Sequence, residues 1–212
     1  MGSEMCIRDR LLADEVMTGF GRTGEWFAWQ HWADAAPDMM LLAKGLTAAH
    51  LPLGAVVLNE RAATFFDDHP LPTGLTYAGH PLCCAAGVAA VETYEREGLV
   101  QRSRELGEWM HGCLAEIAAR HPSVGDVRGM GLFGALELVT DRQTRQPLAP
   151  WPKIAPALKR LFNEAKARGV LFGERGNLII LAPPLIIDQN DLDMGLRLLD
   201  ELLTITDAAS EV

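Results

Sequence analysis

Residues 11–24 read LLADEVMTGFGRTG, and the order of residue types in this stretch decides how the rest of the chain is interpreted. A short apolar run, Leu11–Ala13, ends at the carboxylates of Asp14 and Glu15, and a glycine-rich turn follows. The run predicts the end of a buried parallel strand with Asp14 at its carboxyl end. Open α/β sheets bind their ligands at such strand ends, so Asp14 is the first candidate site residue.

A second apolar run, Met39–Leu42, leads to Lys44, which lies between the small residues Ala43 and Gly45. We expect this run to be a strand that carries Lys44 to the ligand edge of the sheet; the alternative is an ordinary surface lysine. A carboxylate at one strand end and an amine at another suit pyridoxal 5'-phosphate (PLP). The ring nitrogen of PLP needs an anionic partner, and its aldehyde needs an amine.

The glycines of residues 19–24 match the pattern G-x-G-x-x-G, which is typical of dinucleotide-binding turns. Such a turn must open a helix, with an acidic residue ending the next strand. Here the turn leads instead into an aromatic segment, residues 25–32. The sequence therefore disfavours a dinucleotide site.

Composition narrows the classes of partner. The 212 residues are 49% hydrophobic and carry a net charge of −9, which indicates a packed globular protein without a basic surface for nucleic acid. The four cysteines form no C-x-x-C pair, so we expect reduced thiols in a cytoplasmic protein and no metal site. No apolar run is long enough for a membrane span, and the first ten residues do not have the pattern of a signal peptide.

The chain divides by pattern near residue 98. We expect a leader foreign to the fold at 1–10, one domain at 11–98 and a smaller α/β domain at 99–212. In the smaller domain the pattern predicts two short strands, Val170–Phe172 and Leu178–Leu181, joined by a turn at 173–176, and a final helix capped by Asp188. The other predicted elements are strands at 53–58 and within 124–139, and helices at 61–68, 82–96, 99–120 and 154–168.

Six stretches occur in a fixed order over about residues 11–206: ADEVMTGFGRTG, PDMMLLAKGL, PLGAVVL, TYAGHPLCCAA, VGDVRGMGLFGALEL and LAPPLII. Together they resemble the class III aminotransferases, which are PLP-dependent enzymes of fold type I. The resemblance implies an α/β fold that holds the C-terminal part of the PLP-binding large domain, followed by the small C-terminal domain. Members of the family are about twice as long, so we expect this chain to be the C-terminal half of an enzyme.

The resemblance also implies roles for four residues. Asp14 would be the carboxylate on the pyridine nitrogen, Val16 would pack on the ring, and Lys44 would be the Schiff-base lysine and proton carrier. Thr76 would reach the phosphate of the partner subunit's cofactor across a homodimer interface. From the residues alone, we would interpret Thr76 as a turn hydroxyl that caps its own backbone.

Three positions depart from the family pattern or refine it. Met17 stands where many members have a glutamine, and Ile180 stands where members acting on distal amines have an arginine. Arg175, predicted in the turn before Leu178, is the remaining candidate for the substrate carboxylate, with a solvated turn arginine as the alternative.

The implied reaction is transamination of an amine or omega-amino acid with pyruvate or 2-oxoglutarate. An aminomutase, a decarboxylase of the same fold and a catalytically inactive fragment are the alternatives.

Overall fold

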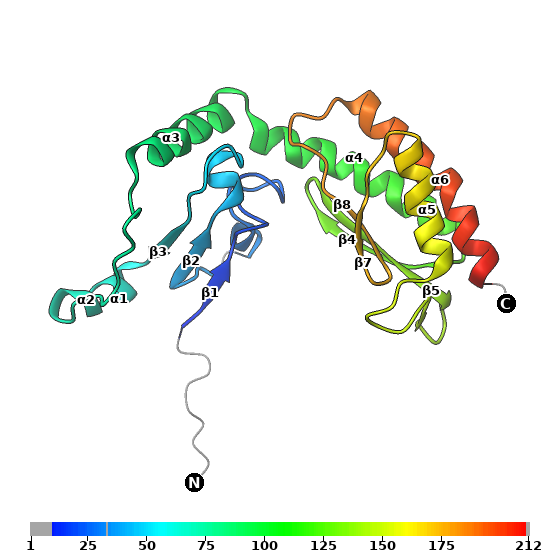
Figure 1. Cartoon of the computed structure of the whole chain (residues 1–212), viewed down its shortest axis with the longest axis horizontal. Coiled ribbons are helices and arrows are strands. Elements are labelled where there is room, and N and C mark those ends of the chain that lie inside the picture. The colour runs from blue at the N-terminus through cyan, green and yellow to red at the C-terminus, as the bar shows by residue number, and fades with distance from the viewer. Residues whose placement is uncertain (1–9, 33, 211–212) are drawn as a thin grey trace, which may run out of the picture. The chain divides into compact units, whose positions relative to one another are not determined.

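The computed structural model describes residues 10–32 and 34–210, which form two compact units that divide after Gln101. Residues 1–9 of the leader predicted at 1–10 lie outside the described residues. The boundary predicted near residue 98 stays a prediction, and each unit is described by itself (Figure 1).

The first unit is built on a three-stranded sheet of order β1-β2-β3. Strand β1 (Leu12–Asp14) runs parallel to β2 (Met39–Leu42), and β3 (Ala55–Leu58) pairs antiparallel with β2. In Figure 1 these strands lie side by side, in blue to cyan. The parallel pair brings the carboxyl ends of β1 and β2 to the same edge of the sheet.

Strand β1 is less buried than its apolar sequence predicts. Leu11 and Leu12 are 47% and 49% exposed, and Val56 on β3 is 61% exposed. Within the described residues β1 pairs only with β2, so its other edge has no neighbouring strand. The prediction of a buried strand is therefore wrong for the described residues, although the strand itself and its direction are as expected.

Short helices and one long helix complete the first unit. The long helix α3 (Pro81–Arg96) begins at a proline, whose fixed φ and missing N–H suit the first helical position. It packs against the 3-10 helix η2 (Lys44–Thr47), and at Gly87 an added Cβ would lie 3.2 Å from the Leu53 side chain and 3.5 Å from the Leu46 carbonyl oxygen of η2. The remaining helices are η1 (Ala28–His31), α1 (Glu60–Ala63) and α2 (Phe65–Asp68).

The second unit is an antiparallel sheet covered by helices on one face. The sheet has the order β4-β5-β8-β7, and β6 pairs with β5. Its strands are β4 (Val124–Met130), β5 (Phe133–Asp141), β6 (Gln146–Pro147), β7 (Gly173–Arg175) and β8 (Leu178–Leu181). The helices are α4 (Leu99–Arg120), α5 (Pro156–Ala167) and α6 (Gln189–Ser210).

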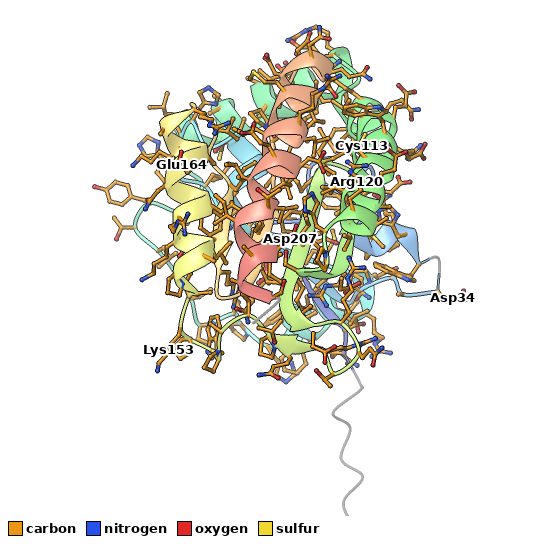
Figure 2. The ribbon with its side chains drawn as sticks, turned by 90° about the vertical axis from the view of Figure 1, so that its right-hand side faces the viewer. Asp34, Cys113, Arg120, Lys153, Glu164 and Asp207 are labelled. Carbon is orange, nitrogen blue, oxygen red and sulfur yellow. The ribbon has the colours of Figure 1, made fainter. Side chains whose placement is uncertain are left out.

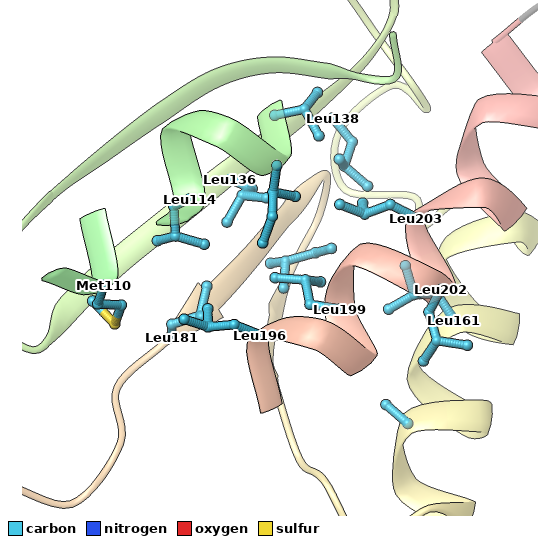
Figure 3. Packing of buried hydrophobic residues seen from close by; sticks show 14 of the residues in the cluster. Met110, Leu114, Leu136, Leu138, Leu161, Leu181, Leu196, Leu199, Leu202 and Leu203 are labelled. Carbon is cyan, nitrogen blue, oxygen red and sulfur yellow. The ribbon is translucent and has the colours of Figure 1, made fainter. Parts of the chain in front are cut away.

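One leucine-rich core lies between these helices and the sheet. Alternate residues of β5, Gly134, Leu136 and Leu138, are buried, as expected for a strand with one covered face. Figure 3 shows leucines of α4, α5 and α6 meeting those of β5 and β8. Side chains with no exposed surface include Met110, Leu114, Leu136, Leu138, Leu158, Leu161, Ile179, Leu199 and Leu203.

The hairpin before α6 is shifted from its predicted place. The sequence predicts a strand at 170–172 and a turn at 173–176, whereas β7 covers Gly173–Arg175 and the turn is Gly176-Asn177. Gly173 is the first residue of β7, where an added Cβ would lie 3.0 Å from the Ile180 side chain, so this strand position favours glycine. Gly176, by contrast, has the positive φ (61°) of a turn residue. Arg175 is therefore the last residue of a strand and not a turn residue.

A polar cluster joins the ends of α4 and α6. The His121 ring places Nδ1 2.6 Å from Asp207 and Nε2 3.0 Å from Asp200, while Arg120 lies 2.9 Å from Asp200. Figure 2 labels Arg120 and Asp207 on these two helices. Partial burial alone would raise the pKa of Asp200, but the hydrogen bonds and positive charges of His121 and Arg120 outweigh it and hold that pKa below its usual value.

Candidate active site

The structure brings Asp14 and Lys44 to one edge of the first sheet. Asp14 is the last residue of β1 and pairs with Leu41 of β2, and the N–H of Glu15 continues the pairing by donating to the Leu41 carbonyl at 3.0 Å. Lys44 begins η2 after β2 has ended at Leu42. Both side chains are exposed, as groups that meet a ligand must be. The carboxylate and the amine thus leave the sheet at the same edge of a parallel strand pair.

Lys44 has an unusual backbone conformation. Its φ is +44°, and Ala48 and Ala49 in the same turn have φ of +49° and +60°. Left-handed conformations are costly for residues with a Cβ and concentrate at functional sites. The turn is held by hydrogen bonds of 3.0 Å from the Ala48 and Ala49 N–H groups to the carbonyls of Gly45 and Lys44.

An open hollow of about 660 Å³ borders this lysine. Its walls come from the turn around Lys44 and from the segment leading to β3, with Thr47, Leu51 and Leu53 among them. Asp14 does not line this hollow. The hollow therefore leaves open space beside Lys44.

Val16 orients the carboxylate of Asp14. Its N–H donates to Asp14 Oδ1 at 3.1 Å, and its side chain is half-buried beside the strand end. Met17, which follows, is 54% exposed. Asp14 and Val16 are thus fixed to each other locally, at the edge that also carries Lys44.

The glycine-rich turn packs against the turn that carries Lys44 and does not open a helix. Residues 16–23 form consecutive turns, and the next helix, η1, is a single 3-10 turn. Phe20, with φ of +59° and 4% exposure, packs under Gly45, where a Cβ would come 2.8 Å from the Phe20 Cβ. The arrangement lacks the helix N-terminus that a dinucleotide phosphate needs.

Glu15 is a structural residue that the sequence did not reveal. Its carboxylate is 2% exposed and accepts hydrogen bonds from the N–H groups of Ala28 (3.0 Å) and Trp29 (2.9 Å) and from the Thr18 hydroxyl. It therefore ties the aromatic segment to the end of β1. A buried carboxylate with several donors is a stable arrangement, but its partners are 13 and 14 residues away and follow no local pattern.

The other predicted residues belong to other elements of the chain. Thr76 belongs to a loop, residues 70–80, in which every residue is exposed. Arg175 is exposed at the end of β7 and belongs to the second unit. In that unit Ile180 lines a pocket of about 550 Å³ with apolar neighbours that include Leu171, Phe172 and Ile187.

Residues 10–32 and 34–210 carry no cluster of metal ligands and no membrane-spanning helix. No group of three or more His, Cys, Asp or Glu side chains there is placed to hold a metal ion. Cys83, Cys84 and Cys113 are free thiols. In the same residues, every helix is too short or too polar to span a bilayer.

The chain is similar to proteins of one family, both in a family model and in individual relatives. The family model of class-III aminotransferases matches residues 4–203. The taurine–pyruvate aminotransferase of Bilophila wadsworthia is 35% identical over 216 aligned positions, covering 95% of this chain and 46% of the relative. An isoleucine 2-epimerase of Lentilactobacillus buchneri is 38% identical over 193, covering 90% and 41%.

A solved structure gives the same result in three dimensions. The taurine:2-oxoglutarate aminotransferase of Bifidobacterium kashiwanohense, in complex with PLP and glutamate, has a TM-score of 0.88 and 40% identity. The match covers 94% of this chain and 44% of that one. The chain thus spans less than half the length of the relatives that it matches.

Proposed function

The chain belongs to the class III aminotransferases, a family of PLP-dependent enzymes of fold type I, and on this premise we propose a transaminase. In the proposal, the protein containing this chain moves an amino group from an amine or omega-amino acid to a keto acid. The observation that carries the proposal is the pair formed by Asp14 and Lys44 at the carboxyl ends of two parallel strands.

The residues at this edge fit PLP chemically. Lys44 offers an exposed primary amine for the cofactor's aldehyde, and Asp14 offers an oriented carboxylate for its ring nitrogen. Val16 adds an apolar side chain next to that carboxylate, where it would pack on the ring. Outside this edge, Thr76 in the exposed loop 70–80 would offer its hydroxyl to the cofactor's phosphate.

The proposed mechanism divides proton handling between two side chains. When bound, PLP supplies an electron-accepting ring that stabilises the charge left when a bond at the substrate Cα breaks. Lys44 Nζ would take the proton from the substrate Cα as a base and would then give it up, as an acid, at the carbon that carried the cofactor's aldehyde. The negative charge of Asp14 would lie beside the ring nitrogen of PLP and would keep that nitrogen protonated.

The choice of substrate is proposed from the second unit. Ile180 lines an apolar pocket, so this position offers no guanidinium for a distal carboxylate. Arg175, exposed at the end of β7, is the proposed carboxylate ligand. Two relatives are named for taurine with pyruvate or 2-oxoglutarate as acceptor, which supports these two keto acids for this protein.

We further propose a homodimer in the cytoplasm. The loop that carries Thr76 and the helix after it expose large apolar side chains, among them Leu75 (78%), Tyr77 (80%) and Leu82 (63%). Such a surface favours an interface with a second copy, across which Thr76 would reach the partner's cofactor. The free thiols of Cys83, Cys84 and Cys113 support a reducing compartment.

The test is a product assay on the full-length protein loaded with PLP. With an amine donor, pyruvate should give alanine or 2-oxoglutarate should give glutamate, and Lys44→Ala should give neither. Absence of either amino acid across a panel of amines and omega-amino acids would reject the transaminase.

An epimerase is the second candidate, because one of the reported relatives is named for it. It would use the same removal of the Cα proton by Lys44, but a proton would return to Cα, and no keto acid would be needed. Incubation of isoleucine in D2O without an acceptor separates the two: inversion at Cα with deuterium uptake supports an epimerase. The same incubation reports an aminomutase or a decarboxylase through a moved amino group or released carbon dioxide.

A further inference from the structure

A tyrosine from a distant helix holds the turn that carries Lys44. The hydroxyl of Tyr94, on α3, donates a 3.0 Å hydrogen bond to the carbonyl of Gly45, 49 residues earlier in the chain. Tyr94 is 8% exposed, so this contact is shielded from water. A shielded hydrogen bond is harder to replace by solvent than an exposed one.

The Gly45 carbonyl is the junction of the turn. It also accepts the Ala48 N–H at 3.0 Å, so the Tyr94 hydroxyl and the turn's own backbone share one acceptor. Lys44 immediately before it has φ of +44°, a conformation that must be maintained by its surroundings. Tyr94 is therefore placed to maintain the peptide next to the lysine.

The ring of Tyr94 is fixed by aromatic neighbours. It stacks on Phe20 with centroids 6.1 Å apart and planes at 27°, and it meets Trp26 edge-on at 6.1 Å. Phe20 itself packs under Gly45. The ring positions thus aim the hydroxyl at the carbonyl, and because burial raises the pKa of Tyr94, with a smaller opposite effect of Arg22, the hydroxyl keeps its proton.

We propose that Tyr94 is a positioning residue for Lys44: its hydroxyl locks the Gly45 carbonyl and so keeps the lysine backbone in the left-handed conformation that presents the amine at the strand edge. The role rests on the proposed function of Lys44. The glycine-rich turn contributes to the same arrangement, because it places Phe20 against both Gly45 and the ring of Tyr94.

The first test removes the hydroxyl alone and needs no cofactor. Tyr94→Phe keeps the ring and its stacking, and Thr93→Val is the matched control because the Thr93 hydroxyl bonds the Ala89 carbonyl of its own helix at 2.8 Å. In the cofactor-free full-length protein, hydrogen exchange at the Leu46, Ala48 and Ala49 amides should quicken about fivefold in Tyr94→Phe. These amides should be unchanged in Thr93→Val, and unchanged exchange in Tyr94→Phe would overturn the proposal.

The second test asks whether the lock serves the amine. With PLP added to the same proteins, borohydride trapping over time measures how fast Lys44 captures the cofactor. Capture should slow about fivefold in Tyr94→Phe and in steady state kcat should fall while KM changes little. Wild-type capture rate and kcat in Tyr94→Phe would leave only a structural role and reject the positioning.

The two proposals fail in different ways. If wild-type protein traps no PLP on Lys44, the proposed function is rejected, while the exchange result still decides whether Tyr94 holds the turn. If wild-type protein traps PLP on Lys44 and Tyr94→Phe traps it equally fast, only the role of Tyr94 is rejected.

Discussion

Asp14 and Lys44 reach the same sheet edge by different local means. Asp14 ends a strand and is oriented by the N–H of Val16, whereas Lys44 follows a strand and depends on a left-handed turn. The first arrangement follows from two neighbouring residues. The second depends on Phe20 and Tyr94, which lie far from Lys44 in the sequence.

Replacing the carboxylate of Asp14 should cost activity without unfolding the protein. Asp14→Asn keeps the shape and the oxygen that accepts from Val16 but removes the negative charge. We expect kcat to fall about 100-fold or more, the cost of losing one oriented electrostatic contact at a reacting centre. Steady-state assays measure this, with Asp34→Asn, an exposed carboxylate of the same unit, as control. An Asp14→Asn enzyme with the kcat of the wild type would contradict the role.

Replacing Glu15 should have the opposite profile. In Glu15→Gln the charge is lost, and the new amide nitrogen, itself a donor, faces the N–H of either Ala28 or Trp29. We expect a loss of about 1–3 kcal/mol in the free energy of unfolding, the usual cost of leaving a buried donor without a partner. Urea unfolding checks this, with the exposed Glu92→Gln as control; equal stability of the two variants would contradict the anchoring role.

The two main site residues could be predicted from the sequence because they lie where apolar strands end. Asp14 and Lys44 follow apolar runs, so their common edge can be predicted from sequence once both runs are taken as parallel strands. Glu15 directly follows Asp14, yet its burial depends on a turn that reverses the chain. The pairing of Tyr94 with Gly45 is a contact between segments that no local pattern connects.

At the scale of elements, helices were easier to predict than the last hairpin. The helix at 99–120 has charges between regularly spaced apolar residues and was predicted with the bounds that α4 has. The hairpin was misplaced because Gly173 and Gly176 look alike in sequence. One fits a close approach to Ile180, and the other fits a positive φ.

The cluster that joins α4 to α6 should make the second unit sensitive to acid. The pKa of Asp200 is lower in the folded protein than its ordinary value, so Asp200 contributes stability above the unfolded-state pKa, about 4, and this is lost as pH falls through the folded pKa. Urea unfolding at pH 7 and pH 3 should show a smaller loss of stability in Asp200→Asn than in wild type.

One other carboxylate in this unit acts in the same direction. The pKa of Asp141 is lowered by hydrogen bonds from the Gln143 and Thr144 backbone, and this contribution remains in both proteins. Asp200→Asn should therefore remove part of the acid sensitivity and not all of it. An identical loss of stability in wild type and variant would show that the cluster does not contribute.

At the scale of the whole molecule, the fold class was predictable because six stretches occur in one order along the chain. Which surfaces are covered was not predictable, since the apolar runs of β1 and β3 look buried in sequence. In the structure Leu12 of β1 and Val56 of β3 are 49% and 61% exposed, because the described residues do not cover them.

The proposed homodimer gives a prediction at this scale. Leu75→Glu places a charge in the exposed loop beside Thr76, and we expect it to shift the full-length protein from dimer to monomer, because an apolar interface does not tolerate an unpaired charge. Leu171→Glu is the matched control, since both leucines are 78% exposed and Leu171 lies in the second unit. Size-exclusion chromatography with light scattering measures the mass; an unchanged dimer in Leu75→Glu would place the interface elsewhere.

The role of Lys44 is tested by borohydride reduction of the full-length protein with PLP, followed by peptide mass spectrometry. This chain has four lysines, and Lys44 is the one outside residues 153–166. We expect a stoichiometric phosphopyridoxyl group on the peptide that contains Lys44, and none on Lys153, Lys159 or Lys166. A protein without the group on Lys44, or with it spread over the other lysines, would show that Lys44 is not the lysine that binds PLP.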